Sequence, residues 1–461
     1  MQSIRTPWLI GTLMVMAIAV WLPHGHTAIQ SPVAQAQTAG RCLSNDPYNL
    51  DGLAAVISSN TPPSAPITIN QHMTVQFVRS ASMGDGGEDT SQQGKPLTGN
   101  PAPVELPANQ ARLDNGPLRI YNTRTGFEYR VTMSSTMLES IAACHEKQGL
   151  MEAGGPITLG MIEGQYPIHL PLVVQSANVT TNTVQAPQEL QGWSDNDDSR
   201  IIRTPTTLWP WRTITQSSSW PDGEQSRCTM TLVGPRHLVT AAHCLVNFGT
   251  NQWKARKLIP ARNGPDVAPY GVSRMTPNPP AGTEAWYIVP DQWLDPTTDS
   301  TDTEEYQWDI GMVLMIDRLG DQTGWMGYGA YNASDLETRE LYNRGYPSCN
   351  SDYTERPANC QIARLYGDTE LCEIGDFHHM GSNGWYREFS VNCDISRGHS
   401  GSAIYHYRYS PSKGKDVPVV VAVVSWHQCF TCPDGDDYPN HVRRITPWAR
   451  DSISWLREQF P

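Results

Sequence analysis

The chain has 461 residues, of which 39% are hydrophobic and 17% are charged. This composition excludes a disordered acidic chain and a protein embedded in a membrane throughout, and the length allows two or three domains. The formal net charge is −13 and no block of Lys or Arg stands out, so the basic surface of a nucleic-acid-binding protein is missing. The 37 glycines and 36 prolines favour many short strands joined by turns.

Residues 1–36 predict a signal peptide. Arg5 precedes an apolar run from Trp8 to Leu22, which is shorter than the ~20 residues that span a bilayer. Ala34 and Ala36 then have the spacing of a cleavage site. An uncleaved anchor is the alternative. Cleavage would give an exported protein, secreted or periplasmic and not bound to a membrane. In such an oxidising compartment, the ten cysteines are expected to form a disulfide framework.

Residues 37–194 are predicted to be a separate N-terminal pro or accessory region. A polar stretch rich in Gly and Pro, residues 82–110, separates plausible strands at 72–78 and 127–133, and a short helix is expected around residues 136–148. Cys42 and Cys144 are the only cysteines of this region, and we expect them to pair. No catalytic constellation is present in it.

Residues 195–461 show a steadier pattern of short apolar strands and turns, which ends in a helix. Thr446 is a suitable N-cap for that helix, and Pro447 suits its first position. Its apolar residues Trp448, Ile453 and Leu456 cannot all share one stripe. We expect most of the helix to pack on a barrel.

The segment from Cys228 to Leu245 predicts two strands followed by a tight turn that holds His243. A general base must be held beside the group that it deprotonates. A bridge between Cys228 and Cys244 would tie the turn to the first strand and contribute ~3 kcal/mol in a loop-entropy model. The alternative is an ordinary loop histidine between two structural cysteines.

Two further residues complete a candidate catalytic set. Asp309 stands at the head of an apolar strand, where a carboxylate can accept the imidazole N–H and stabilise the imidazolium; a strand-capping aspartate is the alternative. Ser400 lies between Gly398 and Gly401, which permit a sharp turn that exposes its hydroxyl. The N–H groups of Gly398 and Ser400 could then form an oxyanion hole.

Together, the motifs TAAHC, WDIGMVLM and GHSGSA resemble the catalytic blocks of the trypsin-like (chymotrypsin-fold) serine peptidases. The likeness runs from about Ser199 to Pro461 and is strongest to the bacterial secreted branch, which includes the glutamyl endopeptidases (V8-like). TGWMGYGAY, RGYPS and VVSWH are further matches. The resemblance implies an all-β chain, a double β-barrel with a C-terminal helix, preceded by the signal peptide and the N-terminal region.

The resemblance also implies a function and a site. The protein would be a monomeric serine endopeptidase that cleaves proteins or peptides through His243, Asp309 and Ser400, without a metal or organic cofactor. A catalytically silent binding protein on the same fold is the alternative. In the animal digestive members, an aspartate before the serine pairs with a freshly cut N-terminus. His399 replaces it here, which argues against that activation route but not against catalysis.

The primary pocket is expected to be walled by Asp394, Ile395, Ser425, Trp426 and His427. Asp394 occupies the place that selects basic residues in trypsin, or it is a structural hydrogen-bond acceptor. Glutamyl endopeptidases carry a hydroxyl residue in place of Ile395 and a histidine just before Trp426. This chain has neither, and His427 is displaced, so the pocket preference stays open.

The remaining cysteines are predicted to pair locally: Cys349 with Cys360, Cys372 with Cys393, and Cys429 with Cys432. The resemblance implies an alternative, in which Cys393 is joined to one of the last two.

Overall fold

The computed structural model describes residues 51–84 (except 71), 116–147, 151, 152, 154 and 198–461, the last range with short gaps at 221–222, 249–251, 280–283, 295–305, 352–355, 358, 382–383 and 428–439. The expected signal peptide, Cys42, and the pair Cys429 and Cys432 therefore lie outside the described residues. Arg41–Pro461 belong to one compact unit. None of the helices in the described ranges has the length and hydropathy needed to cross a bilayer.

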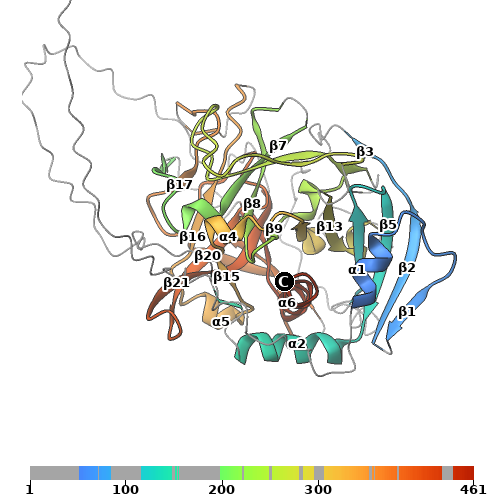
Figure 1. The fold of residues 1–461 in the computed structure, drawn as a ribbon. Coiled ribbons are helices and arrows are strands. Elements are labelled where there is room, and N and C mark those ends of the chain that lie inside the picture. The colour runs from blue at the N-terminus through green and yellow to red at the C-terminus, as the bar shows by residue number, and fades with distance from the viewer. Residues whose placement is uncertain are drawn as a thin grey trace, which may run out of the picture. The chain divides into compact units, whose positions relative to one another are not determined.

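Most of the described elements are antiparallel strands, as expected, and they form two large sheets (Figure 1). The first sheet has the order β1 (Ile67–Asn70), β2 (Met73–Ser80), β5 (Phe127–Met133), β4 (Leu118–Asn122), β13 (Ala285–Pro290), β14 (Gly311–Met315), β9 (His237–Thr240), β8 (Ser226–Leu232), β7 (Ile214–Ser219), β11 (Arg256–Pro260) and β12 (Ser273–Met275). Its first four strands come from the N-terminal region.

The second sheet is built from the C-terminal half of the chain, with one strand from the segment that follows the N-terminal region. Its order is β18 (Ile374–Met380), β19 (Tyr386–Val391), β22 (Asn440–Arg444), β21 (Lys415–His427), β20 (Ala403–Ser410), β16 (Tyr342–Gly345), β17 (Tyr366–Asp368) and β6 (Arg200–Ile202). The short β15 (Gly327–Tyr328) pairs with β21, and β3 (Met83–Gly84) pairs in parallel with β10 (Trp253–Lys254).

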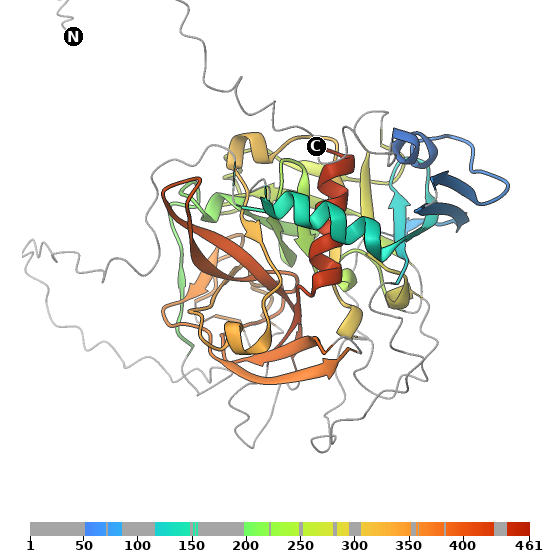
Figure 2. The ribbon, with the colours of Figure 1, turned by 90° about the horizontal axis from the view of Figure 1, so that it is seen from below.

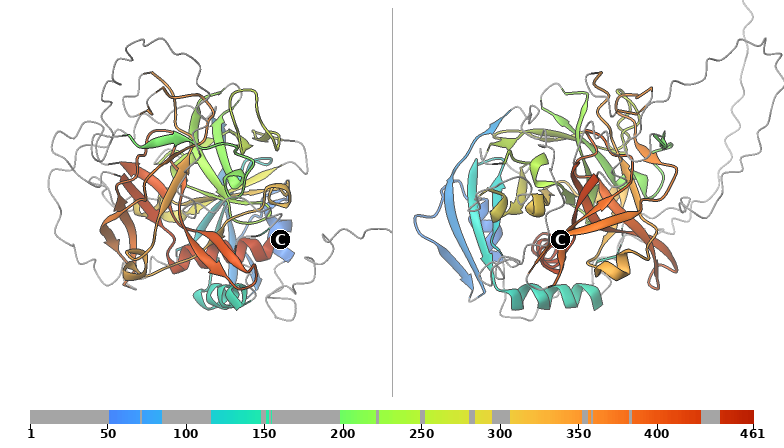
Figure 3. Two further views of the ribbon diagram at one scale, coloured as in Figure 1. Left: turned by 90° about the vertical axis from the view of Figure 1, so that its left-hand side faces the viewer. Right: turned by 180° about the vertical axis from the view of Figure 1, so that it is seen from behind.

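Helices in the described ranges are few and mostly short. They are α1 (Asp51–Ile57), α2 (Ser135–Lys147), α3 (Asp291–Leu294), α4 (Gly320–Thr323), α5 (Ala333–Leu336) and α6 (Pro447–Gln459). In Figure 3, right, the N-terminal strands lie on one side of α6 and the strands of the second sheet lie on the other.

The terminal helix α6 forms where the sequence predicts it. The Thr446 side chain accepts a hydrogen bond from the N–H of Ala449, and Pro447 begins the helix. Trp448, Ile453 and Leu456 are all buried, although they do not share one stripe. The reason is that α6 is covered from two directions, because α2 from the N-terminal region lies across it (Figure 2).

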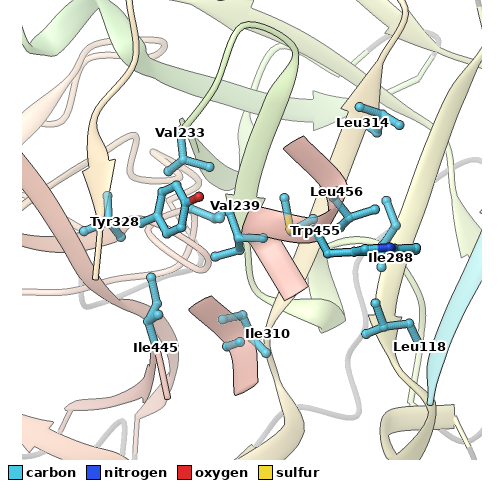
Figure 4. Packing of buried hydrophobic residues seen from close by; sticks show 14 of the residues in the cluster. Leu118, Val233, Val239, Ile288, Ile310, Leu314, Tyr328, Ile445, Trp455 and Leu456 are labelled. Atoms are coloured by element: carbon cyan, nitrogen blue, oxygen red, sulfur yellow. The ribbon is translucent and has the colours of Figure 1, made fainter. Parts of the chain in front are cut away.

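One large apolar cluster lies between the sheets and these helices. Figure 4 shows part of it, with Leu118 from β4 near Ile288 from β13, and with Ile310, Trp455 and Leu456 close by. Residues of the N-terminal region thus share a core with the segment that carries the candidate catalytic residues.

Candidate active site

The turn that holds His243 is fixed from several sides. A 3₁₀ turn, Ala242–Cys244, follows β9, and the predicted bridge between Cys228 and Cys244 is present. Two buried cations bind the carbonyl oxygens of the turn: Lys254 Nζ donates to His243 O at 2.8 Å, and Arg256 Nε donates to Cys244 O at 3.0 Å. Burial lowers the pKa of Arg256 to about 10, so its guanidinium stays charged at neutral pH.

The sequence alone does not indicate the roles of Lys254 and Arg256. The segment carries three cations, Lys254, Arg256 and Lys257, among apolar residues, and nothing in this pattern indicates which of them face the turn.

Asp309 lies against His243 as expected. Its side chain is fully buried at the entry to β14. Asp309 Oδ1 accepts the backbone N–H of His243 at 2.8 Å, and Oδ2 lies 2.7 Å from His243 Nδ1. A carboxylate can only accept, so Nδ1 carries the hydrogen and Nε2 keeps its lone pair. That is the tautomer that a general base needs.

Ser425 supplies a third hydrogen bond to this carboxylate. Its buried hydroxyl donates to Asp309 Oδ2 at 2.6 Å. The sequence placed Ser425 in the wall of the substrate pocket, but its hydroxyl is directed at the acid. Its contribution is therefore to hold Asp309 in place.

The turn with Ser400 packs on β8 and on the end of β9, the strand that leads to His243. Ser400 O accepts from the N–H of Thr229 at 2.8 Å, and the N–H of Gly401 donates to Val424 O at 2.7 Å. Cys244 Sγ lies 3.5 Å from Ser400 O. A Cβ on Gly401 would come within 2.0 Å of Thr240 Oγ1, so only glycine permits this approach.

The backbone of the same turn has two N–H groups free to bind an anion. Gly398 has φ 93°, and a Cβ there would lie 2.4 Å from Tyr346 O. Within the described part of the chain, the N–H groups of Gly398 and Ser400 have no acceptor, and the partly exposed Ser400 hydroxyl makes no hydrogen bond. The arrangement can accommodate an oxyanion beside a nucleophile.

His399 is fully buried. Its Nδ1 accepts the N–H of Ser396 at 3.1 Å, and its ring packs on Gly345. Burial, together with the nearby Arg200 charge, holds the pKa of His399 well below its usual range. A neutral ring at this place agrees with the expectation that it does not pair with a terminal ammonium group.

Two of the residues expected to wall the primary pocket, Asp394 and Ile395, are instead engaged in contacts within the fold. Asp394 is buried and Oδ2 accepts the N–H of Ser199 at 2.7 Å. Burial raises the pKa of Asp394 to about 6. Ile395 packs in an apolar cluster of the second sheet, and the side chains of Trp426 and His427 lie outside the described residues. Of the two alternatives for Asp394, the geometry favours the structural acceptor.

Two further predicted disulfides are present in this half of the chain. Cys349 is bonded to Cys360, and Cys372 to Cys393. The local pairing of Cys393 is therefore confirmed, and the alternative that joins it to Cys429 or Cys432 is wrong.

The described residues include two groups with the composition of a metal site. One contains Cys228, His243 and Cys244, and the other contains Asp368, Cys372 and Cys393. In both, the two sulfurs are tied in a disulfide, whereas a metal ligand must be a thiolate. Neither group fits a metal ion.

Comparison with known proteins confirms the resemblance to the bacterial glutamyl endopeptidases and finds a second bacterial protease among the relatives. A glutamyl endopeptidase of Bacillus licheniformis is 27% identical over 164 residues, 35% of this chain and 44% of the relative. An extracellular metalloprotease of Bacillus subtilis is 32% identical over 152 residues, 32% and 43% of the two chains. The chain thus matches less than half the length of these relatives. No protein-family model matches.

Solved structures of peptidases resemble the chain more weakly. A Glu endopeptidase in complex with MPD has a TM-score of 0.39 and 17% identity, and covers 57% of this chain and 98% of its own. The protease Anisep from Arthrobacter nicotinovorans has a TM-score of 0.35 and 15% identity, and covers 56% and 99%. At these scores the structural likeness adds no argument.

Proposed function

We propose that the protein is an exported serine endopeptidase that hydrolyses peptide bonds through His243, Asp309 and Ser400. The two sheets would be the two β-barrels of the chymotrypsin fold, with the catalytic turns between them. Sequence similarity to a glutamyl endopeptidase supports the reaction class.

The reaction follows from the roles of the three residues. His243 Nε2 takes the proton of Ser400 Oγ as the oxygen attacks the peptide carbonyl, and the N–H groups of Gly398 and Ser400 bind the oxyanion. The imidazolium then protonates the leaving amine, and water hydrolyses the acyl-enzyme. The substrate is a protein or peptide, and no cofactor takes part in these steps.

The observation that carries the proposal is the contact between Asp309 and His243. Asp309 binds both the backbone N–H and Nδ1 of His243, at 2.8 and 2.7 Å. A strand-capping aspartate would need only the first contact. The second fixes the tautomer and stabilises the charge that forms on the ring during catalysis.

The domain organisation is part of the same proposal. Residues 1–36 would be removed as a signal peptide, residues 37–194 would form the pro or accessory region, and residues 195–461 would form a monomeric peptidase domain outside the cytoplasm. The name of the second relative, an extracellular protease, is consistent with export.

The test uses a mixed peptide library and a serine-directed fluorophosphonate probe on the purified protein and on Ser400→Ala. We expect cutting and labelling by the parent, and a loss of ~10⁶-fold in turnover in the variant. Ser334→Ala, which removes an exposed serine of α5, is the matched control and should behave as the parent.

Two results would decide against the proposal. Equal cutting by the parent and Ser400→Ala would assign the activity to another group. No cutting and no labelling by either protein, including after trimming of the N-terminal region, would favour the silent binding protein.

A further inference from the structure

We propose that residues 51–147 are a permanent subdomain of the peptidase, which stays bound to residues 198–461 when the chain between them is cut. The inference refines the proposed function, because it decides between a released pro-segment and a retained accessory region. It predicts a mature enzyme of two chains if the connection is processed.

The first argument is the continuity of the sheet. β4 pairs with β13 from Asn122 opposite Trp286 to Leu118 opposite Pro290, and every residue of β13 is buried. If β4 left, β13 would become an apolar edge strand with unpaired N–H and C=O groups. Such an edge is a template for aggregation, which folded proteins avoid.

The second argument is a group of charges, buried except for the partly exposed Arg130, that crosses the same boundary. Arg119 of β4 binds Glu128 of β5 and also Asp291 of α3, with Nε at 2.8 Å from Asp291 Oδ1. Arg130 of β5 binds the other oxygen of Asp291 at 2.5 Å. Buried ion pairs fix register and orientation, since each charge is costly to leave without its partner. Asp291 would lose both of its cationic partners if the N-terminal strands were released.

The third argument is the contact between helices. His145 Nε2 of α2 lies 3.1 Å from Glu458 Oε2 of α6, and both side chains are buried. Met137, Leu138 and Ile141 of α2 belong to the same apolar cluster as the core of α6. Figure 2 shows α2 crossing α6. Removal of α2 would expose the face of α6 that it covers.

The fourth argument connects the N-terminal region with the candidate catalytic base. β3 pairs with β10, and Trp253 of β10 stacks on Tyr121 of β4 with ring centroids 4.8 Å apart. Trp253 Nε1 also donates to Glu128 Oε2 at 3.1 Å. The next residue, Lys254, holds the carbonyl oxygen of His243. The N-terminal region therefore supports the strand that fixes the catalytic turn.

The described contacts do not fit a segment that blocks the site. None of the hydrogen bonds or ion pairs described for residues 51–84 and 116–147 reaches the turn Gly398–Gly401. An inhibitory pro-segment should cover the nucleophile, whereas this region covers the edge of the first sheet and α6.

The experiment uses the full chain with Ser400→Ala, so that no self-cleavage occurs, and a specific protease site inserted between Gly192 and Trp193. After cutting, the two fragments should co-elute as one species on size exclusion, in native buffer and in 1 M salt. Glu128→Gln should raise their dissociation constant about tenfold or more, the loss expected for a charged hydrogen bond. Asp321→Asn, which neutralises an exposed ion pair, should leave it unchanged.

Separation of the parent fragments in native buffer, with the C-terminal fragment still unfolding in one cooperative transition, would overturn the proposal. The proposal would also be overturned if the natural mature protein gave no peptides from residues before about Asp198. Co-elution of the parent fragments decides the question even if Glu128→Gln does not fold. Because these measurements need no catalysis, their failure is distinct from failure of the proposed function.

Discussion

Replacing Asp368 with Asn should reduce the loss of unfolding free energy that the parent protein shows between acid and neutral pH. Asp368 is buried in β17, and its Oδ2 accepts the N–H of Asp394 at 3.1 Å. Burial, together with the nearby Asp394 charge, raises the pKa of Asp368 to about 8, against the opposing charges of Arg344 and Arg200. Within the described residues, Oδ1 of each aspartate is buried without a hydrogen-bond partner, so neither oxygen has a donor that would stabilise a negative charge on it.

The sign of the effect follows from proton linkage. The unfolded chain loses the proton of Asp368 near its reference pKa of ~3.9, whereas the folded protein keeps it to about pH 8. Between these values the folded state binds more protons, so its stability falls as pH rises. The slope from one proton is at most ~1.4 kcal/mol per pH unit, which is at most ~3 kcal/mol between pH 5 and 7. Asn keeps the acceptor for Asp394 and has no proton to lose.

The assay is urea unfolding from pH 4.5 to 8.5, in a Ser400→Ala background to prevent self-digestion. We expect Asp368→Asn to flatten the decline of unfolding free energy toward neutral pH. Buried groups that do not interact with Asp368, such as Asp451, whose pKa burial raises to about 6, contribute equally to both proteins and cancel in the difference. Asp394 interacts with Asp368, so any change in its titration is part of the measured effect. Asp321→Asn is the exposed control. If Asp368→Asn and its parent show the same slope, Asp368 is ionised in the folded state and the reasoning is wrong.

Three further substitutions test the support of the catalytic base. Lys254→Met removes the buried donor to His243 O and should lower kcat ~10-fold or more with little change in KM; Lys257→Met, on the neighbouring strand, should be near the parent value. Ser425→Ala removes one of three hydrogen bonds to Asp309 and should lower kcat by roughly tenfold, an effect absent if Ser425 acts only on substrate binding. Asp309→Asn should cost ~10⁴-fold in kcat through the wrong tautomer, and activity near that of the parent would exclude Asp309 from the site.

The features that sequence could predict are those encoded in short segments. Three features each depend on residues close together in the chain: the turn at Gly398 and Gly401, the cap at Thr446, and the bridge between Cys228 and Cys244. Turn chemistry and capping are local, so the pattern alone indicates the geometry. The contact of Asp309 with His243 was expected from the family's order of motifs rather than from spacing.

The position of the N-terminal strands could not be read from the sequence. Arg119 of β4 faces Val289 of β13 in the sheet, and strands so far apart in the chain leave no periodic signal of their pairing. A weak signal existed in "AWYIVP", because a continuous apolar run is typical of a strand covered on both faces. Sequence does not indicate the role of Ser425 for a similar reason, since Ser425 is on β21 of the second sheet and its partner Asp309 lies just before β14 of the first.

His243 is bound at both of its backbone polar groups, the N–H and the carbonyl oxygen, which explains why residues outside the catalytic set should affect the rate. Asp309 holds its N–H and ring, while Lys254 holds its carbonyl oxygen. The base is thus positioned before a substrate arrives, and that orientation contributes to the rate only if it is kept. Because β10 carries Lys254 and is paired with β3, loosening the N-terminal region should slow turnover more than it weakens substrate binding.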